Sequence, residues 1–179
     1  MDLTGSQTEK NLLEAFQGES MARNKYTFFA SKAKKAGYLH LAKIYEDTAN
    51  NEKEHAKIWY KHLHNEDISD TIENINNCIE NELYEHKTMY PEFAKIAKEE
   101  GFKEIAKHFE EVAEIEGMHH KRFLAMLNAI ENNYVFERNT EIEWECSNCG
   151  YIHKSKKAPK ICPACSHPQE YFWEHCKNY

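Results

Sequence analysis

Apolar residues recur at steps of three and four along most of residues 6–132, which is the pattern of helices that bury one face. This period predicts four long helices, over residues 6–35, 38–64, 70–99 and 102–132. Gly37 and Gly101 fall between the members of each pair, where a helix end favours a residue that tolerates positive φ. The pattern therefore predicts a mainly helical fold of the four-helix-bundle type.

The two halves of this helical region repeat one another. A shift of 64 residues places Tyr26 on Tyr90 and Gly37 on Gly101. One offset breaks the repeat, because Glu19 precedes Tyr26 by seven residues and Glu82 precedes Tyr90 by eight. A single extra residue inside a helix usually forms a π-bulge, so we expect one between Glu82 and Tyr90.

The helical period is lost after residue 132. We expect residues 1–133 to form the helical domain, 134–143 to be a linker that leads into a first strand, and 144–179 to form a small second domain. This last segment combines Gly, Pro and aromatic residues with four spaced cysteines. We expect its aromatic residues to supply a small core: Trp144, Tyr151, Tyr171, Phe172 and Trp173.

The core-facing stripe of the predicted bundle carries ionisable residues. Glu52 and His55 lie three residues apart on one seam, and Glu116 and His119 occupy the equivalent places on the other. A lone charged residue on a helix is usually solvated, but two Glu-x-x-His motifs in equivalent seam positions are not explained that way. The remaining two helices add further seam carboxylates: Glu19, Glu82 and Glu85.

Burying ionised carboxylates costs several kcal/mol each unless a cation compensates them. One Glu from each of two helices, with Glu-x-x-His from each of the other two, is the ligand pattern of two-iron and two-manganese sites in ferritin-like bundles. Mixed carboxylate and imidazole ligation suits either metal. We predict iron, although the spacing does not choose between the two.

The cysteines predict a second metal site. "CSNCG" at 146–150 and "CPAC" at 162–165 are two Cys-x-x-Cys motifs, a pattern typical of a tetrathiolate site for zinc or a single iron. A zinc ribbon acting as a binding module is one alternative. The redox site expected upstream favours iron, because it needs electrons. Cys78 and Cys176 are left over as unpaired thiols.

The overall composition narrows the possible partners. A net charge of −7 disfavours nucleic acid and anionic membranes as partners. No apolar run approaches the roughly 18 residues of a membrane span, and the N-terminus lacks the features of a secretion signal. We therefore expect a cytoplasmic protein whose thiols stay reduced.

The chain resembles rubrerythrin over nearly its full length. The resemblance is carried by "AFQGESMARNKYTFFASKA", "NNEKEHAK", "MYPEFAKIAKEEGF", "EGMHHKRF" and "CSNCGYIHKSKKAPKICPACSHPQEYF". It implies a ferritin-like bundle with an oxo- and carboxylate-bridged di-iron site, followed by a rubredoxin-like domain with an Fe(Cys)4 centre that zinc can replace. Glu52 and Glu116 would bridge the irons, and Tyr26 and Tyr90 would lie beside them. The implied di-iron ligands are Glu19, Glu52, His55, Glu82, Glu85, Glu116 and His119, and the implied ligands of the single iron are Cys146, Cys149, Cys162 and Cys165.

The resemblance also implies a function, a non-haem peroxidase that reduces hydrogen peroxide to water and protects against oxidative stress. Electrons would come from NAD(P)H through a separate reductase or rubredoxin, since the chain has no dinucleotide-binding fingerprint. The alternative is a ferroxidase or iron-storage protein of the ferritin type, which would leave the cysteine module without a role.

The connection between the two helix pairs is short. In a ferritin-like bundle the second and third helices run parallel, so residues 64–70 must return along much of the bundle. Six to eight residues span only about 20–28 Å when fully extended. We therefore expect a homodimer, and consider a domain-swapped form in which two chains exchange helix pairs.

Overall fold

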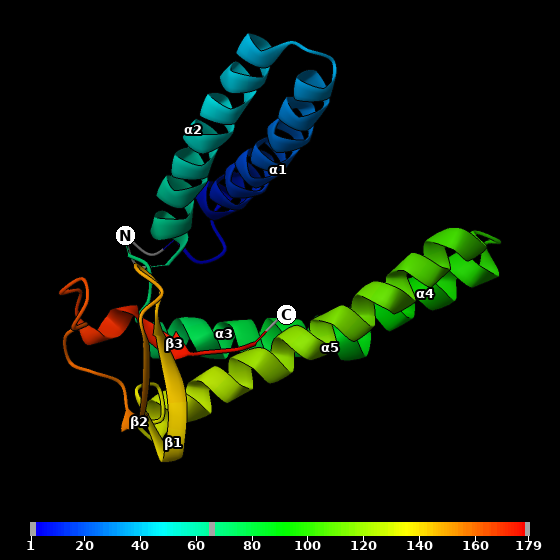
Figure 1. Ribbon diagram of the computed structural model, residues 1–179. Coiled ribbons are helices and arrows are strands. Elements are labelled where there is room, and N and C mark those ends of the chain that lie inside the picture. Colours follow the sequence, from blue (N-terminus) through cyan, green and yellow to red (C-terminus); the bar gives the residue numbers. More distant parts are fainter. Residues whose placement is uncertain (1–2, 65–66, 178–179) are drawn as a thin grey trace. The chain divides into compact units, whose positions relative to one another are not determined.

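The computed structural model describes residues 3–64 and 67–177 and confirms the expected fold class, a mainly helical chain followed by a small strand module (Figure 1). None of the described helices combines the length and hydrophobicity of a membrane span. The helical elements are α1 (Gln7–Lys35), α2 (Leu39–Leu63), α3 (Thr71–Tyr84), the π-helical segment η1 (Glu85–Met89), α4 (Tyr90–Glu99) and α5 (Lys103–Glu131). The strand module contains β1 (Glu137–Cys146), β2 (Ile152–Lys157), the 3-10 turn η2 (Gln169–Tyr171) and β3 (Phe172–Glu174).

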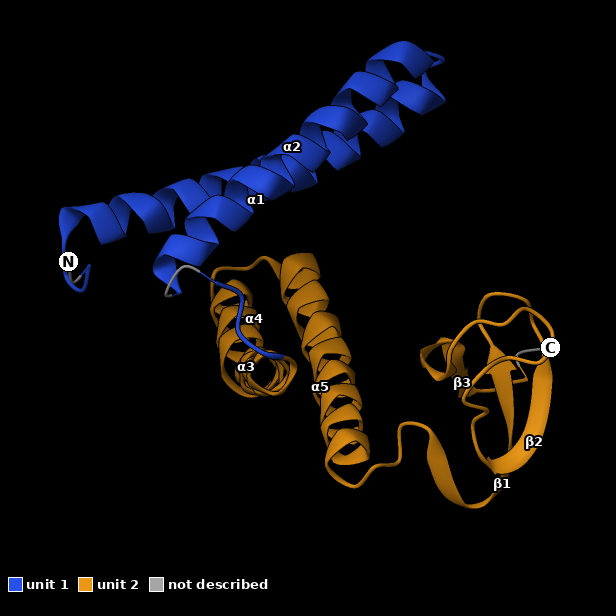
Figure 2. Cartoon of the chain, turned by 90° about the vertical axis from the view of Figure 1, so that its left-hand side faces the viewer, with its two compact units in different colours: residues 1–70 blue, residues 71–179 orange. Residues whose placement is uncertain are grey.

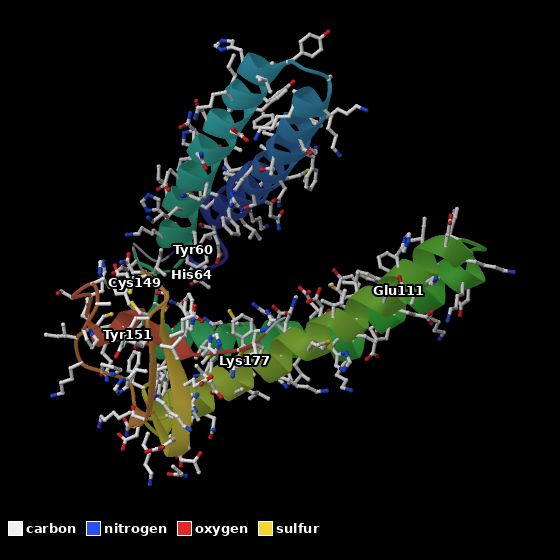
Figure 3. All side chains as sticks on the ribbon, viewed as in Figure 1. Tyr60, His64, Glu111, Cys149, Tyr151 and Lys177 are labelled. Carbon is white, nitrogen blue, oxygen red and sulfur yellow. The ribbon has the colours of Figure 1, made fainter. Side chains whose placement is uncertain are left out.

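The chain divides into two compact units, residues 1–70 and 71–179 (Figure 2). The first unit is a hairpin of α1 and α2. Ser6 caps α1 by accepting a hydrogen bond from the Glu9 amide at 3.0 Å. Where α2 ends, the ring of His64 stacks on the ring of Tyr60, with the ring centroids 4.0 Å apart (Figure 3).

In the second unit α3, η1 and α4 form one interrupted helix that packs on α5, so the two units repeat the same hairpin. Both hairpins turn at the predicted glycines. Gly37 has a φ of +84° and Gly101 a φ of +90°, a conformation that side chains with a Cβ rarely adopt. The next amide in each turn donates to a carbonyl five residues back, from Tyr38 to Ala33 at 3.0 Å and from Phe102 to Ala97 at 2.8 Å. This is the Schellman arrangement that ends a helix.

Small residues line the contact between the two helices of each hairpin. The buried positions of the described helices are alanines and one glycine: Ala30 and Ala33 on α1, Ala42, Ala49 and Ala56 on α2, Ala94 and Ala97 on α4, and Ala106, Ala113 and Gly117 on α5. The larger apolar side chains of the predicted seams are only half covered, as Leu41 is 41% exposed and Ile105 48% exposed. Each hairpin therefore keeps a broad apolar face of its own.

The expected irregularity in the third predicted helix is present. Residues Glu85–Met89 form a π-helical turn between α3 and α4. The corresponding part of α1 runs without interruption from Gln7 to Lys35. The extra residue inferred from the Glu82–Tyr90 spacing is therefore accommodated by widening one turn, as π-bulges do.

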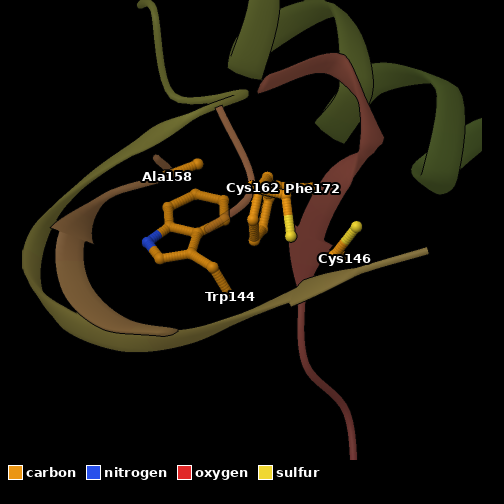
Figure 4. Packing of buried hydrophobic residues seen from close by; sticks show 5 residues of the cluster. All are labelled: Trp144, Cys146, Ala158, Cys162 and Phe172. Carbon is orange, nitrogen blue, oxygen red and sulfur yellow. The ribbon is translucent and has the colours of Figure 1, made fainter. Parts of the chain in front are cut away.

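The strand module is an antiparallel sheet in the order β2-β1-β3. Its first strand begins at Glu137, inside the segment that we expected to lead into a strand. The buried cluster consists of Trp144, Cys146, Ala158, Cys162 and Phe172 (Figure 4). The expected aromatic core is thus only partly correct, because Tyr171 is 40% exposed and Trp173 56% exposed. Two cysteines and an alanine fill that space instead.

The alanine contacts give the first prediction. Ala42→Leu and Ala106→Leu each force three extra carbon atoms into a fully buried position, so we expect each to lower the free energy of unfolding by about 1–3 kcal/mol. Ala125→Leu, at an exposed position of α5, is the matched control and should have little effect. Urea unfolding followed by circular dichroism measures all three. Equal stability of the buried and exposed variants would contradict the assignment of the hairpin contact.

Candidate metal centres

The first hairpin brings three of the predicted ligands together. The Nδ1 atom of His55 lies 2.9 Å from a carboxylate oxygen of Glu52 on the same helix and 3.8 Å from one of Glu19 on α1. One ligand atom from each residue lies within 4.8 Å of the other two. Two metal–ligand bonds of about 2.2 Å span at most about 4.4 Å, so small side-chain shifts suffice for a shared ion.

The second hairpin repeats this geometry with the matching residues. His119 Nδ1 lies 2.6 Å from Glu116 on α5 and 3.4 Å from Glu82 on α3. These three residues also form a group whose ligand atoms lie within 4.8 Å of one another. We call the two sets, Glu19–Glu52–His55 and Glu82–Glu116–His119, the first and second carboxylate–histidine groups. Each hairpin therefore carries one complete group.

Electrostatics of both groups favour a bound cation. Burial and the hydrogen bond and charge of Glu52 raise the pKa of Glu19, and burial and Glu116 do the same for the pKa of Glu82. Within the described residues, the ion pairs of these four carboxylates are with histidines, and none is with lysine or arginine. Oxygen and imidazole donors with uncompensated negative charge fit a divalent metal such as iron.

The remaining predicted residues of the helical site lie nearby but outside these groups. Glu85 is half-buried on the π-turn η1. Burial and the charges of Glu85, Glu116 and Glu82 raise the pKa of Tyr90. Tyr90 lies against Phe93 and Phe109, while in the first unit Tyr26 stacks on Tyr45 with ring centroids 6.2 Å apart.

The four predicted cysteine ligands of the strand module lie together. The Sγ atoms of Cys146 and Cys165 are 3.7 Å apart, and those of Cys149 and Cys162 are also 3.7 Å apart. A regular tetrahedron with metal–sulfur bonds of about 2.3 Å has edges of about 3.8 Å, so the sulfurs already have the spacing of a tetrathiolate site. All four cysteines are free, and Cys149 lies at the exposed side of the module (Figure 3).

Two matching backbone knuckles hold these sulfurs. Gly150 and Ser166, each directly after the second cysteine of its motif, have φ values of +75° and +59°. Their amides donate to the carbonyls of Cys146 and Cys162 at 2.8 and 2.9 Å. The His167 amide lowers the pKa of Cys165 to about 6. The Tyr151 amide also lowers the pKa of Cys149, but contact with the other sulfurs and burial outweigh it and raise this pKa to about 12. Four thiolates at this spacing therefore need a cation to compensate their charge.

Two histidines near the second carboxylate–histidine group were not predicted from the sequence. His86 on η1 donates from Nδ1 to the carbonyl of Ala113 on α5 at 2.6 Å. His120 on α5 donates from Nδ1 to the carbonyl of Ile79 on α3 at 3.0 Å. The repeat contained a signal for His120, since the equivalent position in the first hairpin is Ala56. The replacement of Ala56 by His120 in the repeat, next to the predicted ligand His119, thus indicated an extra contact in the second hairpin.

The raised pKa values of Glu19 and Glu82 give a prediction for the metal-free protein. A raised pKa means that the folded chain holds the proton more tightly than the unfolded chain, so stability is highest below the unfolded pKa and falls as pH rises through the folded pKa. Glu19→Gln and Glu82→Gln remove this ionisation. We expect both metal-free variants to unfold at a higher urea midpoint than the original chain at pH 7.

The difference should shrink as the pH falls below the carboxyl range, where the original chain is protonated too. Glu14→Gln, at an exposed position of α1, is the control for loss of a surface charge. A difference that is the same at every pH would contradict the electrostatic explanation.

Known protein families match both the helical region and the strand module of the chain. A family model described as rubrerythrin matches residues 10–127, and one described as the rubrerythrin rubredoxin-like domain matches residues 144–173. A rubrerythrin from Porphyromonas gingivalis is 49% identical, covering 99% of this chain and 94% of the relative. A rubrerythrin from Nitratidesulfovibrio vulgaris is 44% identical over 95% of each chain, and nigerythrin from the same organism is 32% identical over 92% of this chain and 85% of its own.

Proposed function

Because the chain belongs to the rubrerythrin family, we propose that it is a peroxidase that reduces hydrogen peroxide to water with iron at the two carboxylate–histidine groups and at the four cysteines. The observation that carries the proposal is the repeat of one carboxylate–histidine geometry in both hairpins, beside a separate tetrathiolate site. Two equivalent groups suit a pair of metal ions, and the thiolates suit a one-electron relay. Protection against oxidative stress follows from the substrate.

The residues of the helical site have distinct roles in this proposal. Glu52 and Glu116 have side chains only 16% and 14% exposed, less than those of Glu19 and Glu82, and would bridge the two ions. Glu19, Glu82 and Glu85, together with His55 and His119, would complete the ligand set. When bound, the paired irons supply the two electrons that cleave the O–O bond, and the tetrathiolate iron returns electrons singly. Each peroxide also takes up two protons to give two waters.

Aromatic side chains enclose one side of this site in each hairpin. Tyr26, Phe29 and Tyr45 cluster in the first unit, and Tyr90, Phe93 and Phe109 cluster in the second. In the proposed closed site these rings would limit the access of water to the carboxylates on that side. Burial and, after it, the nearby carboxylates raise the pKa of Tyr90 above its ordinary value, so the phenol is protonated at neutral pH and is available to donate a hydrogen bond.

The electron donor is proposed to be a separate reductase or rubredoxin that reduces the tetrathiolate centre. Such a chain needs a reducing compartment, where free thiols persist, and we place it in the cytoplasm. Zinc at the four cysteines would fit the same sulfur spacing but would leave the electron relay without a carrier.

Cys165→Ser tests this relay. We expect turnover of peroxide with a reductase to fall to background, while one equivalent of peroxide still oxidises the chemically reduced helical site, because only the electron supply is cut. Cys176→Ser, an exposed thiol outside the four ligands, should behave as the original chain. Stopped-flow absorbance and steady-state peroxide consumption measure the two steps. Normal turnover by Cys165→Ser would rule out the relay.

The half-covered seams support a further part of the proposal, a homodimer in which two hairpins close face to face over the metal site. The seam side chains of each hairpin remain exposed, with Phe93 42% and Leu41 41% accessible. Closing two such faces buries apolar area at about 25 cal/mol per Å² and brings the two carboxylate–histidine groups together. We propose that the paired hairpins come from different chains.

Mixing two defective variants distinguishes the swapped from the unswapped dimer. We co-refold Glu52→Ala with Glu116→Ala and measure recovered peroxide turnover. A swapped heterodimer combines the intact first hairpin of one chain with the intact second hairpin of the other, so activity should return. Each variant refolded alone is the control. An unswapped dimer has one lesion in every bundle, and the absence of recovery would rule out the swap.

A further inference from the structure

His86 occupies an unusual place in the second unit. It directly follows Glu85 on the π-turn η1, and its half-buried ring lies over the backbone of Gly117 on α5. A Cβ atom at residue 117 would come within 2.8 Å of the His86 Cε1 atom and 2.9 Å of Nδ1. Real Cβ atoms do not approach so closely, so only glycine at this position leaves room for the ring.

A hydrogen bond fixes the ring in that position. The Nδ1 atom of His86 lies 2.6 Å from the carbonyl oxygen of Ala113, one turn before Gly117. A carbonyl only accepts, so Nδ1 carries the proton whether the imidazole is neutral or charged. The contact thus ties the π-turn to α5 immediately beside Glu116, one of the two carboxylates proposed to bridge.

Among the residues that the structure describes, the first hairpin has no counterpart of this contact. Lys53 stands at the position equivalent to Gly117, α1 has no π-turn, and Ala22 stands where the second hairpin has Glu85. The histidine, the glycine and the π-turn therefore occur only in the hairpin that carries the extra carboxylate. Their occurrence together suggests that the contact between His86 and α5 acts on the orientation of Glu85.

The reason lies in the geometry of a π-turn. The extra residue of a π-turn can move along a helix, and each step of one residue turns the affected side chains by about 100° around the axis. A contact that holds the turn at one place therefore fixes which face of the helix Glu85 occupies. The His86–Ala113 hydrogen bond provides such a contact at the residue next to Glu85.

We propose that His86 is a positioning residue, which locks the π-turn through Ala113 and Gly117 and so fixes the direction in which Glu85 faces at the metal site proposed above. The proposal rests on the metal site proposed above, but it concerns the protein groups that set the ligand's direction. It assigns a reason to the glycine that follows Glu116.

Two glycine variants form a matched test. Gly117→Ala adds a methyl group that displaces the His86 ring, whereas Gly18→Ala adds the same group beside Glu19 with nothing within 4 Å. Both replace a helical glycine next to a ligand, so both improve helix propensity. In protein whose thiolate site already holds one equivalent of Zn²⁺, Co²⁺ is titrated and followed by visible absorbance. We expect Gly117→Ala to weaken Co²⁺ binding about 10–100-fold and Gly18→Ala to leave it unchanged.

Substitutions of His86 itself separate the hydrogen bond from mere packing. His86→Leu fills the space without a donor and should weaken Co²⁺ binding like Gly117→Ala. His86→Asn keeps an N–H donor near the Nδ1 position and should restore binding. In a Glu85→Gln background, His86→Leu should have no further effect, because its action passes through Glu85. Additive losses in that double variant would overturn the proposal.

Amide hydrogen exchange of the metal-free protein gives an independent readout. We expect faster exchange confined to residues 85–90 in His86→Leu and Gly117→Ala, with His86→Asn and Gly18→Ala matching the original chain. Unchanged exchange in His86→Leu would overturn the role of the histidine. Neither measurement depends on peroxide turnover, so a failure of the proposed activity is distinguishable from a failure of this assignment.

Discussion

Negative charge on the apolar face of each hairpin is the constraint on which the rest of the helical structure depends. Glu52 and Glu116 are mostly enclosed already within single hairpins, and each has a second carboxylate as a neighbour. Burial and that neighbour raise the pKa values of Glu19 and Glu82, so ionisation of these groups opposes folding in the absence of a cation. Binding of metal at the groups would reverse the sign of this contribution.

The same constraint explains why each helix has two different apolar surfaces. Buried alanines let α1 approach α2, and α4 approach α5, and ring pairs such as Tyr26–Tyr45 and Phe93–Phe109 pack across the same contacts. The bulky seam residues, together with the carboxylates, remain on the face that a second hairpin would cover. The buried alanines thus belong to the hairpin itself, whereas the exposed seam residues are available for the closure of the metal site proposed above.

The small core of the strand module is built in a different way. Its buried cluster has five residues, of which two belong to the four-cysteine group, so the candidate site and the core share the same atoms. Trp144 is completely buried and donates its indole N–H to the Ser155 carbonyl at 3.1 Å. Small modules of this kind generally need a metal to fold, so binding at the four cysteines would stabilise this core directly.

Sequence periodicity was sufficient to predict the helices, their glycine turns and the π-turn, because each of these depends on local spacing. The one-residue offset between Glu82 and Tyr90 was as informative as the motifs themselves. Periodicity could not show that the alanines are buried in the hairpin while bulky seam residues such as Leu41 and Ile105 stay half exposed, since both sets recur at helical spacing. It also missed the burial of Ala158 in place of Trp173, and the contact between His86 and Gly117, which lie 31 residues apart and meet only through the packing of two helices.

Iron content after anaerobic reconstitution of the metal-free chain tests the central claim most directly. The account predicts two irons at the carboxylate–histidine groups and one at the cysteines of the original chain. It predicts that a Glu52→Ala/Glu116→Ala double variant retains only the thiolate iron, identified by its visible absorption. A double variant that still holds all of the iron, or an original chain that holds iron only at its cysteines, would contradict the account.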